Sequence, residues 1–427
     1  MDRFDIEGGT RLEGEVTVTG AKNAALPLMA AAILSSGTTR LKGVPELRDI
    51  DTMSDILHAV GVEVRRAADG TLEITPTEES LCKAPYKLVS KMRGSICVLG
   101  PLLAKRGRAL VSMPGGCVIG VRPIDLHLKG MRALGADLEL DDGYVNATAK
   151  RLTGAEIYLG GAFGSTTLGT CNVMMAASLA EGRTIIECAA CEPEIVDVAA
   201  MLTKMGARIV GAGSHRITVD GVRELKAVEH EVIPDRIVAG TFMAAAALTR
   251  GRITINGARL DHLTAVIDTL RKIGVSVEPA DGGCCVSAKD GLRATDVVAL
   301  PYPGVPTDVQ AQISAVLATA QGISIVTDKV FPDRFMHVAE LNRLGVEIRK
   351  EGSSAIIIGK PKLRGAEVMA SDLRASAALV LAGVAAEGKT IVHRVYHVDR
   401  GYDCIENDLN RLGARIERTQ EDPKELS

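Results

Sequence analysis

The stretch LNRLGVEIR at residues 341–349 recurs almost unchanged as LNRLGARIE at residues 409–417. In both copies an apolar, helix-forming segment ends at a glycine, and an alternating, strand-forming segment follows. Glycine suits the left-handed conformation that commonly ends a helix. The same phrase surrounds four more glycines, at positions 61, 135, 206 and 274. Six copies of one phrase indicate that the chain is built from repeated units.

A second phrase precedes each of these copies. It consists of a helix rich in Ala and Leu, then a glycine, then a strand, as in AAAALTRGRITINGA at residues 244–258. Its glycines, at positions 37, 107, 182, 251, 322 and 388, follow one another at intervals of 66 to 75 residues. The sequence therefore predicts six helix–strand–helix–strand repeats of about 70 residues each.

The composition of the predicted elements indicates how the repeats pack. Helical segments such as TFMAAAALT (241–249) are apolar on every side, so they should be buried all round. The strands alternate apolar and polar residues, so each sheet should expose one face to water. We expect an α/β fold with helices inside and sheets outside, in two lobes of three repeats. A cleft between two lobes is the expected ligand site.

Whole-chain properties exclude several classes of protein. The net charge is -3 over 427 residues, whereas nucleic-acid binders usually carry a basic patch. No apolar run is long enough to span a membrane, and the charged start of the chain does not resemble a signal peptide. The eight histidines lack metal-ligand spacing, and CAAC (188–191) lacks a second cysteine pair, so no metal site is expected. Most of the nine cysteines should be free, buried and inert.

Polar residues stand where the first helix of each repeat should begin. They are Lys22 and Asn23, Arg93, Asn172, Asp235 and Arg236, Asp308, and Asp372 with Arg374. Asn and Asp at such positions can simply be N-caps. Lys and Arg oppose the helix dipole there, so their presence favours an anion site at converging helix starts.

The loop MPGGCVIGVRPIDLHLKG (113–130) holds a cysteine between two glycines and an arginine. Cys117 could be an ordinary half-buried loop residue. It could also be a reactive thiol, because a nearby arginine and a helix start both lower a thiol pKa. Gly115 and Gly116 would let the loop move as a lid. Pro123 suits the first turn of the helix that follows.

The whole chain resembles the UDP-N-acetylglucosamine enolpyruvyl transferases, or 1-carboxyvinyltransferases. The Gly-Gly-Cys loop followed by Arg-Pro-Ile-Asp-Leu is the most specific match. The other matching stretches run from end to end of the chain: GAKNAALPLMAA (20–31), EPEIVDVA (192–199), PDRIVAGTF (234–242), PTDVQAQ (306–312), FPDRFMHVAELNRLG (331–345), DLRASAALVLAG (372–383) and VYHVDRGYDCIENDLNRLGA (395–414).

This resemblance implies the enolpyruvyl transferase fold, a two-lobe inside-out α/β barrel with three repeats in each lobe. One lobe would comprise residues 22–233, and the other would combine residues 1–21 with 234–427. The implied reaction transfers the enolpyruvyl group of phosphoenolpyruvate to the 3′-hydroxyl of UDP-N-acetylglucosamine. It releases phosphate through a tetrahedral intermediate and is the first committed step of peptidoglycan synthesis.

The resemblance also implies roles for individual residues. Asp308 would be the base for the 3′-hydroxyl, although an N-cap role is open to it as well. Cys117 would be a proton donor or would carry a covalent adduct of phosphoenolpyruvate, and it would be alkylated by the inhibitor fosfomycin. Between donor and carrier the sequence does not decide. No cofactor is expected apart from that adduct.

Further residues would bind the substrates. The residues expected to bind phosphoenolpyruvate are Lys22, Asn23, Arg93, Arg122 and Arg400. Of these, Lys22 and Arg400 are also expected to be catalytic. Those expected to bind UDP-N-acetylglucosamine are Asn23, Arg93, Arg122, Pro123, Ile124, Asp125, Leu126, Thr166, Thr167, Asp308, Val330 and Phe331. Arg334, Asp372 and Arg374 would engage when the lobes close. Residues 165–170, STTLGT, depart from the family pattern Ser-Val-Gly-Ala-Thr, so the two threonine hydroxyls would replace its diphosphate contacts.

We expect a cytoplasmic monomer that binds two small molecules, no nucleic acid and no membrane. One alternative is the sister enzyme that acts on shikimate 3-phosphate. Another is a non-catalytic paralogue that senses the sugar nucleotide or binds a partner. Such a paralogue should have lost catalytic residues, whereas Lys22, Cys117, Arg122, Asp308 and Arg400 are all present.

Overall fold

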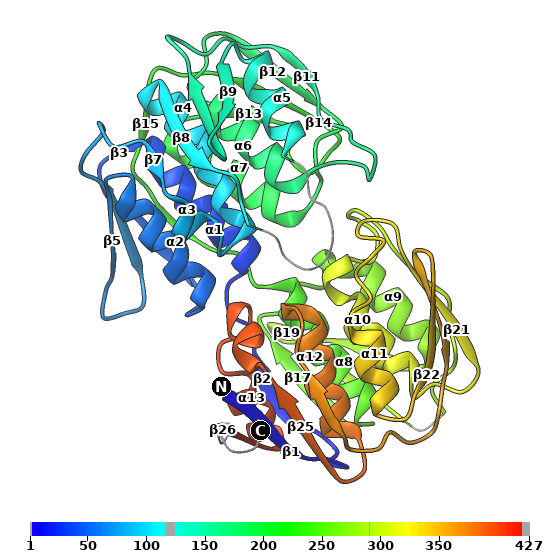
Figure 1. Ribbon diagram of the computed structural model, residues 1–427. Helices are drawn as coiled ribbons and strands as arrows, with labels where there is room; N and C mark the ends of the chain where they lie inside the picture. Colours follow the sequence, from blue (N-terminus) through cyan, green and yellow to red (C-terminus); the bar gives the residue numbers. More distant parts are fainter. Residues whose placement is uncertain (1, 116–123, 290, 421–427) are drawn as a thin grey trace. The chain divides into compact units, whose positions relative to one another are not determined.

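The computed structural model describes residues 2–115, 124–289 and 291–420 (Figure 1). Cys117, Arg122 and Pro123 lie outside these residues. The described chain forms two compact units, which we call the N-unit (residues 20–115 and 124–233) and the C-unit (residues 2–19, 234–289 and 291–420).

The elements alternate along the chain as the repeats require. Those of the N-unit are α1 (Lys22–Ala31), η1 (Ala32–Leu34), β3 (Ser35–Ser36), β4 (Thr39–Lys42), α2 (Arg48–Ala59), β5 (Val62–Arg66), β6 (Leu72–Pro76), β7 (Lys83–Ala84), α3 (Tyr86–Val89), η2 (Arg93–Val98), α4 (Leu99–Arg106), β8 (Arg108–Ser112), α5 (Asp125–Ala133), β9 (Asp137–Asp141), β10 (Tyr144–Thr148), β11 (Glu156–Tyr158), α6 (Thr167–Ala177), β12 (Arg183–Glu187), α7 (Pro193–Met205), β13 (Arg208–Val210), β14 (Arg216–Asp220), β15 (Leu225–Lys226) and β16 (Glu229–Glu231).

The elements of the C-unit are β1 (Asp2–Glu7), β2 (Glu13–Thr17), α8 (Arg236–Leu248), β17 (Arg252–Asn256), η3 (Leu260–His262), α9 (Thr264–Ile273), β18 (Val275–Ala280), β19 (Gly283–Ala288), β20 (Val297–Ala299), α10 (Thr307–Leu317), β21 (Ile323–Asp328), α11 (His337–Arg343), β22 (Glu347–Glu351), β23 (Ser354–Ile358), β24 (Glu367–Met369), α12 (Leu373–Ala385), β25 (Lys389–His393), η4 (Val395–Arg400), α13 (Ile405–Arg411) and β26 (Arg415–Gln420).

Among the described residues the strands form six four-stranded sheets, which matches the six predicted repeats. Their orders are β16-β4-β6-β5, β7-β8-β10-β9, β11-β12-β14-β13, β18-β19-β17-β2, β20-β21-β23-β22 and β24-β25-β1-β26. Each sheet contains one parallel pair, such as β11 with β12, and two antiparallel pairs. A further two-stranded sheet joins β15 to β3.

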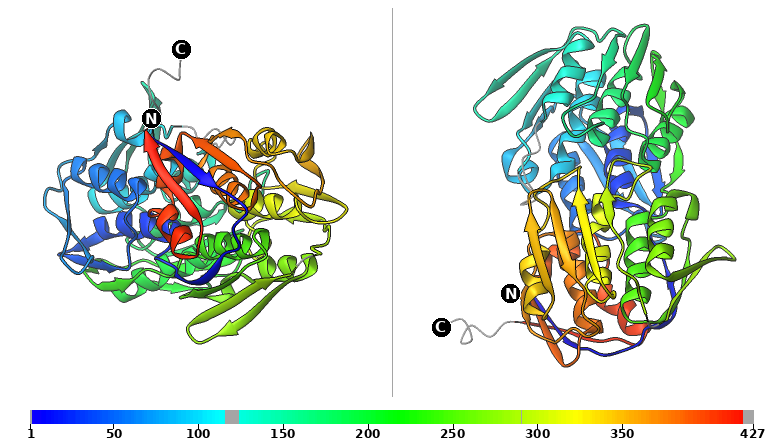
Figure 2. Two further views of the ribbon diagram at one scale, coloured as in Figure 1. Left: turned by 90° about the horizontal axis from the view of Figure 1, so that it is seen from below. Right: turned by 90° about the vertical axis from the view of Figure 1, so that its right-hand side faces the viewer.

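The last sheet is completed by the start of the chain. Strand β1 pairs with β25 on one side and with β26 on the other, so Phe4 lies opposite both Val392 and Arg418. In Figure 2 this blue strand runs beside the red strand of the C-terminal region. The sixth repeat therefore takes one of its strands from residues 2–7 rather than from its own segment.

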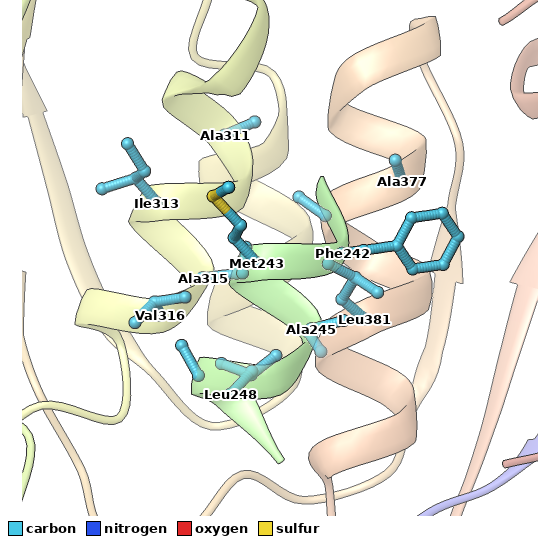
Figure 3. Packing of buried hydrophobic residues seen from close by; sticks show 14 of the residues in the cluster. Phe242, Met243, Ala245, Leu248, Ala311, Ile313, Ala315, Val316, Ala377 and Leu381 are labelled. Atoms are coloured by element: carbon cyan, nitrogen blue, oxygen red, sulfur yellow. The ribbon is translucent and has the colours of Figure 1, made fainter. Parts of the chain in front are cut away.

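Buried helices form the centre of each unit, as the sequence predicts. In the C-unit, α8, α10 and α12 contact one another, and all 13 residues of α8 are buried. Figure 3 shows Phe242 and Met243 of α8 among Ala311, Ile313 and Leu381 of the two neighbouring helices. The corresponding helices of the N-unit are α1, α4 and α6. Strands such as β12 alternate buried and more exposed residues, so one face of the sheet packs on these helices.

The six glycines of the first phrase all adopt the predicted left-handed conformation, with φ between 73° and 113°. The second phrase has one exception. In the fourth repeat Arg250, with φ 56°, takes the left-handed position instead of Gly251. Its guanidinium donates hydrogen bonds to the carbonyl oxygens of Ala247 and Thr319, which hold an arginine in a conformation that usually favours glycine.

Candidate active site

Four residues that the sequence singles out lie together in the C-unit. The carboxylate of Asp308 accepts a hydrogen bond from Arg334 Nη1 at 2.6 Å and lies 3.5 Å from Arg374 Nη2. Arg334 Nη2 also approaches Asp372 Oδ1 at 3.9 Å. Asp308 retains 25% side-chain exposure, whereas the side chains of Arg334 and Arg374 are 8% and 1% exposed. We call these four residues the Asp308 cluster.

Helix starts place these side chains. Asp308 is the second residue of α10, and the N-cap position before that helix is Pro306 rather than Asp308. Asp372 is the N-cap of α12, where its Oδ1 accepts hydrogen bonds from the backbone N–H groups of Arg374 and Ala375. The N-cap interpretation therefore applies to Asp372, and the side chain of Asp308 is directed instead to the two arginines.

The charges of the Asp308 cluster support one another. Burial alone would lower the pKa of Arg334, but the carboxylates of Asp308 and Asp372 outweigh burial and raise it. Burial likewise opposes the charge of Arg374, yet Tyr402 and Asp308 together raise its pKa above the usual value. Both guanidiniums are therefore fully charged, and their charges favour the ionised form of Asp308.

A buried polar network holds the aromatic ring that Arg374 contacts. Its guanidinium lies 5.4 Å from the ring centre of Tyr402, which is within cation–π range. The Tyr402 hydroxyl lies 2.8 Å from Thr241 Oγ1, and Gln312 Nε2 donates to both oxygens. These hydrogen bonds join helices α8 and α10 to the segment after η4. They therefore hold the Tyr402 ring in position against the Arg374 guanidinium.

Val330 and Phe331 follow the end of β21 in the same unit. Their backbone N–H groups donate to Asp328 Oδ1 at 2.9 and 2.7 Å, and both side chains are partly exposed. The guanidinium of Arg334 lies 5.9 Å from the Phe331 ring centre. The segment expected to contact nucleotide therefore adjoins the Asp308 cluster.

Arg400 ends η4 and is partly exposed. The residue before it, Asp399, is held by a bidentate ion pair with Arg418, at 2.7 and 3.2 Å. Arg418 Nε also donates to Glu406 at 2.7 Å. The C-terminal strand thus fixes the turn that carries Arg400.

In the N-unit, the predicted cation Lys22 forms a buried ion pair. Its Nζ lies 3.0 Å from Asp49 Oδ2, and the two side chains are 8% and 5% exposed. Lys22 and Asn23 are the first residues of α1, and Asp49 lies in the first turn of α2. Asp49 is not among the residues predicted from the sequence, although an acidic residue in a first helical turn is a recognisable feature.

Arg93 begins η2, a 3₁₀ helix that leads into α4, and it is partly exposed. Near it lies His127, whose pKa is lowered to about 3 by burial first and by Arg93 second. His127 Nδ1 accepts a hydrogen bond from Asn172 Nδ2 at 2.9 Å, since a neutral imidazole nitrogen is the acceptor here.

The expectation that Asn172 opens a helix is wrong. Helix α6 begins five residues earlier, at Thr167, and Asn172 is fully buried inside it. Its side chain instead accepts from the backbone N–H of Gly100 and donates to the carbonyl oxygen of Ile96, both at 2.8 Å. A buried amide needs such partners, so its role is to join α6 to η2 and α4.

The remaining predicted nucleotide residues of the N-unit lie at two helix starts. Ile124 is buried, whereas Asp125 and Leu126 open α5 with exposed and partly exposed side chains. Thr166 is the N-cap of α6 and accepts from the N–H of Gly169 at 3.2 Å. Thr167 donates to Glu192 at 3.1 Å. Both hydroxyls thus have local partners, and their contact with diphosphate stays a prediction.

The Cys117 loop is described up to Gly115. A Cβ atom on Gly115 would lie 1.8 Å from the carbonyl oxygen of Ser90, so close backbone packing requires glycine there. The proposed roles of Cys117, Arg122 and Pro123, and of Gly116 in loop movement, concern residues outside the described chain.

The eight described cysteines are free, but fewer are buried than expected. Cys97, Cys171, Cys191 and Cys284 are buried, three others are partly exposed, and Cys404 is exposed. Burial raises the pKa of Cys404, and Glu406 and Asp403 add to that rise. The expectation of mostly buried thiols therefore holds for only half of them.

Within the described residues, no group of three or more His, Cys, Asp or Glu side chains is arranged to hold a metal ion. None of the described helices combines the length and the apolar character that crossing a membrane requires.

Comparison with known proteins defines the class first. Residues 6–409 match the EPSP synthase (3-phosphoshikimate 1-carboxyvinyltransferase) family. The structure of the enolpyruvyl transferase NikO from Streptomyces tendae has a TM-score of 0.88 at 26% identity, covering 99% of each chain. EPSP synthase from Acinetobacter baumannii has a TM-score of 0.75 at 21% identity, with 98% of this chain and 100% of that chain covered, and it shares the fold. The predicted fold class is confirmed.

Closer relatives define the particular family. UDP-N-acetylglucosamine 1-carboxyvinyltransferase 2 of Carboxydothermus hydrogenoformans is 52% identical, covering 99% of this chain and 100% of that protein. UDP-N-acetylglucosamine 1-carboxyvinyltransferase of Anaeromyxobacter sp. is also 52% identical, with 98% and 99% covered. The chain therefore belongs to the UDP-N-acetylglucosamine 1-carboxyvinyltransferases of the EPSP synthase family, which confirms the resemblance.

Proposed function

We propose that this protein transfers the enolpyruvyl group of phosphoenolpyruvate to the 3′-hydroxyl of UDP-N-acetylglucosamine and releases phosphate. It is an enzyme of peptidoglycan synthesis. Relatives that carry the activity in their names are 52% identical over nearly the whole chain. The observation that carries the mechanism is Asp308, a partly exposed carboxylate held between two buried guanidiniums.

Asp308 would act as the general base. It would accept the proton of the 3′-hydroxyl while that oxygen forms a bond to C2 of phosphoenolpyruvate, and a proton would add to C3. Loss of the C3 proton and cleavage of the C2–O bond to phosphate would then form the product. The carboxylate must be ionised and within hydrogen-bond reach of the hydroxyl. Arg334 and Arg374 support the first condition, and the 25% exposure of Asp308 supports the second.

Cations would bind the phosphate and carboxylate of phosphoenolpyruvate. We assign this task to Lys22, Arg93, Arg122 and Arg400, with Asn23 beside them. Asp49 would hold the buried Lys22 ammonium in place through the ion pair at 3.0 Å. Arg418 and Asp399 would orient the Arg400 turn in the same way.

The proposed proton donor to C3 is Cys117, which would otherwise carry a covalent adduct of phosphoenolpyruvate. No further cofactor enters the reaction. We expect the enzyme to work as a monomer in the cytoplasm, where phosphoenolpyruvate and nucleotide sugars are metabolites. Arg334, Asp372 and Arg374 would engage the substrates when they bind.

A phosphate-release assay tests this function. Phosphoenolpyruvate should release phosphate when UDP-N-acetylglucosamine is present and should release none when it is omitted. Release with shikimate 3-phosphate instead would assign the sister activity. Tight binding of the sugar nucleotide in calorimetry without any release would assign a sensing role and contradict the enzyme.

A further inference from the structure

Asp328 is a charged side chain that the reaction itself does not use. It ends β21, its side chain is fully buried, and burial raises its pKa while the hydrogen bonds from Phe331, Thr307 and Val330 oppose the rise. A buried carboxylate is costly unless its oxygens are well satisfied, so its position requires an explanation beyond packing.

The two oxygens of Asp328 serve two different elements. Oδ1 accepts the backbone N–H groups of Val330 and Phe331, at 2.9 and 2.7 Å. Oδ2 accepts the hydroxyl of Thr307 at 2.6 Å. One side chain therefore fixes the Val330–Phe331 turn with one oxygen and the first residue of α10 with the other.

Thr307 links Asp328 to the proposed base, Asp308, through Arg334. Its hydroxyl has one hydrogen, which goes to Asp328, so its oxygen is free to accept. It accepts Arg334 Nη1 at 3.2 Å, and that same nitrogen donates to Asp308 Oδ1 at 2.6 Å. Asp328, Thr307, Arg334 and Asp308 thus form one continuous chain of hydrogen bonds, in which Arg334 Nη1 donates to both Thr307 and Asp308.

We propose that Asp328 is a positioning residue that couples the Val330–Phe331 turn to the Asp308 base through Thr307 and Arg334. The assignment rests on the function proposed above. Oδ1 governs the turn expected to contact the nucleotide, and Oδ2 governs the position of the base. Sugar-nucleotide affinity and turnover then depend on different oxygens of one carboxylate.

Thr307→Val cuts the link to the base and leaves the Val330–Phe331 turn capped. We expect kcat to fall roughly 10- to 100-fold, as small misplacements of catalytic groups do. The KM for UDP-N-acetylglucosamine should stay within about twofold, because the Oδ1 bonds are untouched. Thr307→Ser keeps the hydroxyl and should restore kcat to nearly that of the wild type.

Asp328 variants extend the same measurement. Asp328→Asn keeps an oxygen for the two N–H groups but offers Thr307 a donor instead of an acceptor, so it should resemble Thr307→Val. The double variant Asp328→Asn/Thr307→Val should have a kcat no lower than that of either single variant, because both substitutions break the same link. Asp328→Ala removes both links and should raise the KM for UDP-N-acetylglucosamine as well as lower kcat.

Thr327→Val is the matched control. Thr327 lies beside Asp328, and its hydroxyl lies 2.7 Å from Oγ of Ser354 on β23. This variant should lose stability without a selective loss of kcat. Phosphate release at varied UDP-N-acetylglucosamine concentration gives both constants for each variant.

The outcomes separate the two hypotheses. An active wild type with equal kcat for Thr307→Val and Thr307→Ser overturns the positioning role and leaves the enzyme function standing. A wild type that releases no phosphate overturns both. If Asp328→Ala does not fold, the Thr307 pair and the Thr327 control still decide, since Thr307→Val and Thr327→Val each replace one hydroxyl and Thr307→Ser removes only a methyl group.

Discussion

The two units hold their proposed catalytic charges by opposite means. In the N-unit the proposed catalytic group is a cation, Lys22, and a carboxylate holds it at 3.0 Å with both side chains buried. In the C-unit the proposed catalytic group is a carboxylate, Asp308, and two guanidiniums hold it while it stays 25% exposed. Arg334 is shared further with Asp372.

Because of this difference, substitutions in the two units should affect different properties, namely the free energy of unfolding and the turnover rate. Removing one member of a buried ion pair leaves an uncompensated charge in a low-dielectric environment, which is expensive. Removing the charge of the partly exposed Asp308 should cost less, because Arg334 keeps Asp372 as a partner and Arg374 keeps its contact with the Tyr402 ring. Substitutions at Asp308 should therefore act mainly on the reaction, and those at Asp49 mainly on folding.

The largest effect is expected for Asp308→Asn. Loss of a general base lowers kcat by roughly 10²- to 10⁴-fold. The asparagine oxygen can still accept from Arg334, so the free energy of unfolding should change far less than turnover does. Phosphate release and urea denaturation of the same preparation measure the two effects. Asp333→Asn, at a side chain that is 77% exposed, serves as the control. A normal kcat for Asp308→Asn would remove Asp308 from the reaction.

Asp49→Asn should have the second largest effect, and it should act on stability. Breaking a buried pair by removing one partner typically costs about 3–5 kcal/mol. Urea unfolding should show this loss, whereas Asp51→Asn on the exposed face of the same helix should stay within about 0.5 kcal/mol of the wild type.

A double variant sharpens this result. Lys22→Met combined with Asp49→Asn removes the charge that the single change leaves uncompensated, so part of the lost stability should return. If Asp49→Asn is as stable as the wild type, the pair is not the buried restraint that its geometry indicates.

These ion pairs and hydrogen bonds also show which features of the site can be predicted from the sequence and which cannot. The six repeats are predictable because each one carries the same helix–glycine–strand phrase, and the sequence also points to Asp308, Arg334, Asp372 and Arg374. It does not point to Asp49 and Asp328, because their importance depends on partners 27 and 21 residues away that only the folded chain brings near. Asn172 was misplaced because a buried amide and a helix cap look alike in sequence.

Acid pH should affect the two units in the same way. Burial lowers the pKa of His127 in the N-unit to about 3 and that of His337 in the C-unit to about 4. An unfolded histidine titrates near 6.5, so below that pH the unfolded chain binds more protons than the folded one. Stability present above about pH 6.5 should therefore fall by about 1.4 kcal/mol per pH unit for each histidine, until the folded pKa is reached.

Urea unfolding between pH 7 and 4.5 measures this slope. His127→Gln and His337→Gln should each flatten it by one proton, and the double variant by two, whatever their effect at pH 7. An unchanged slope in either variant would mean that the histidine is not held neutral by burial.

The smallest effect is expected at Thr166, where a structural and a substrate role can be told apart. Its hydroxyl caps α6, so Thr166→Ala should cost about 1 kcal/mol of stability. Thr166→Ser keeps the capping hydroxyl and should therefore be about as stable as the wild type. If the hydroxyl also binds the diphosphate, Thr166→Ala should in addition raise the KM for UDP-N-acetylglucosamine. A stability loss with an unchanged KM would leave Thr166 as a cap alone, and would show that the departure at residues 165–170 costs the N-unit a nucleotide contact.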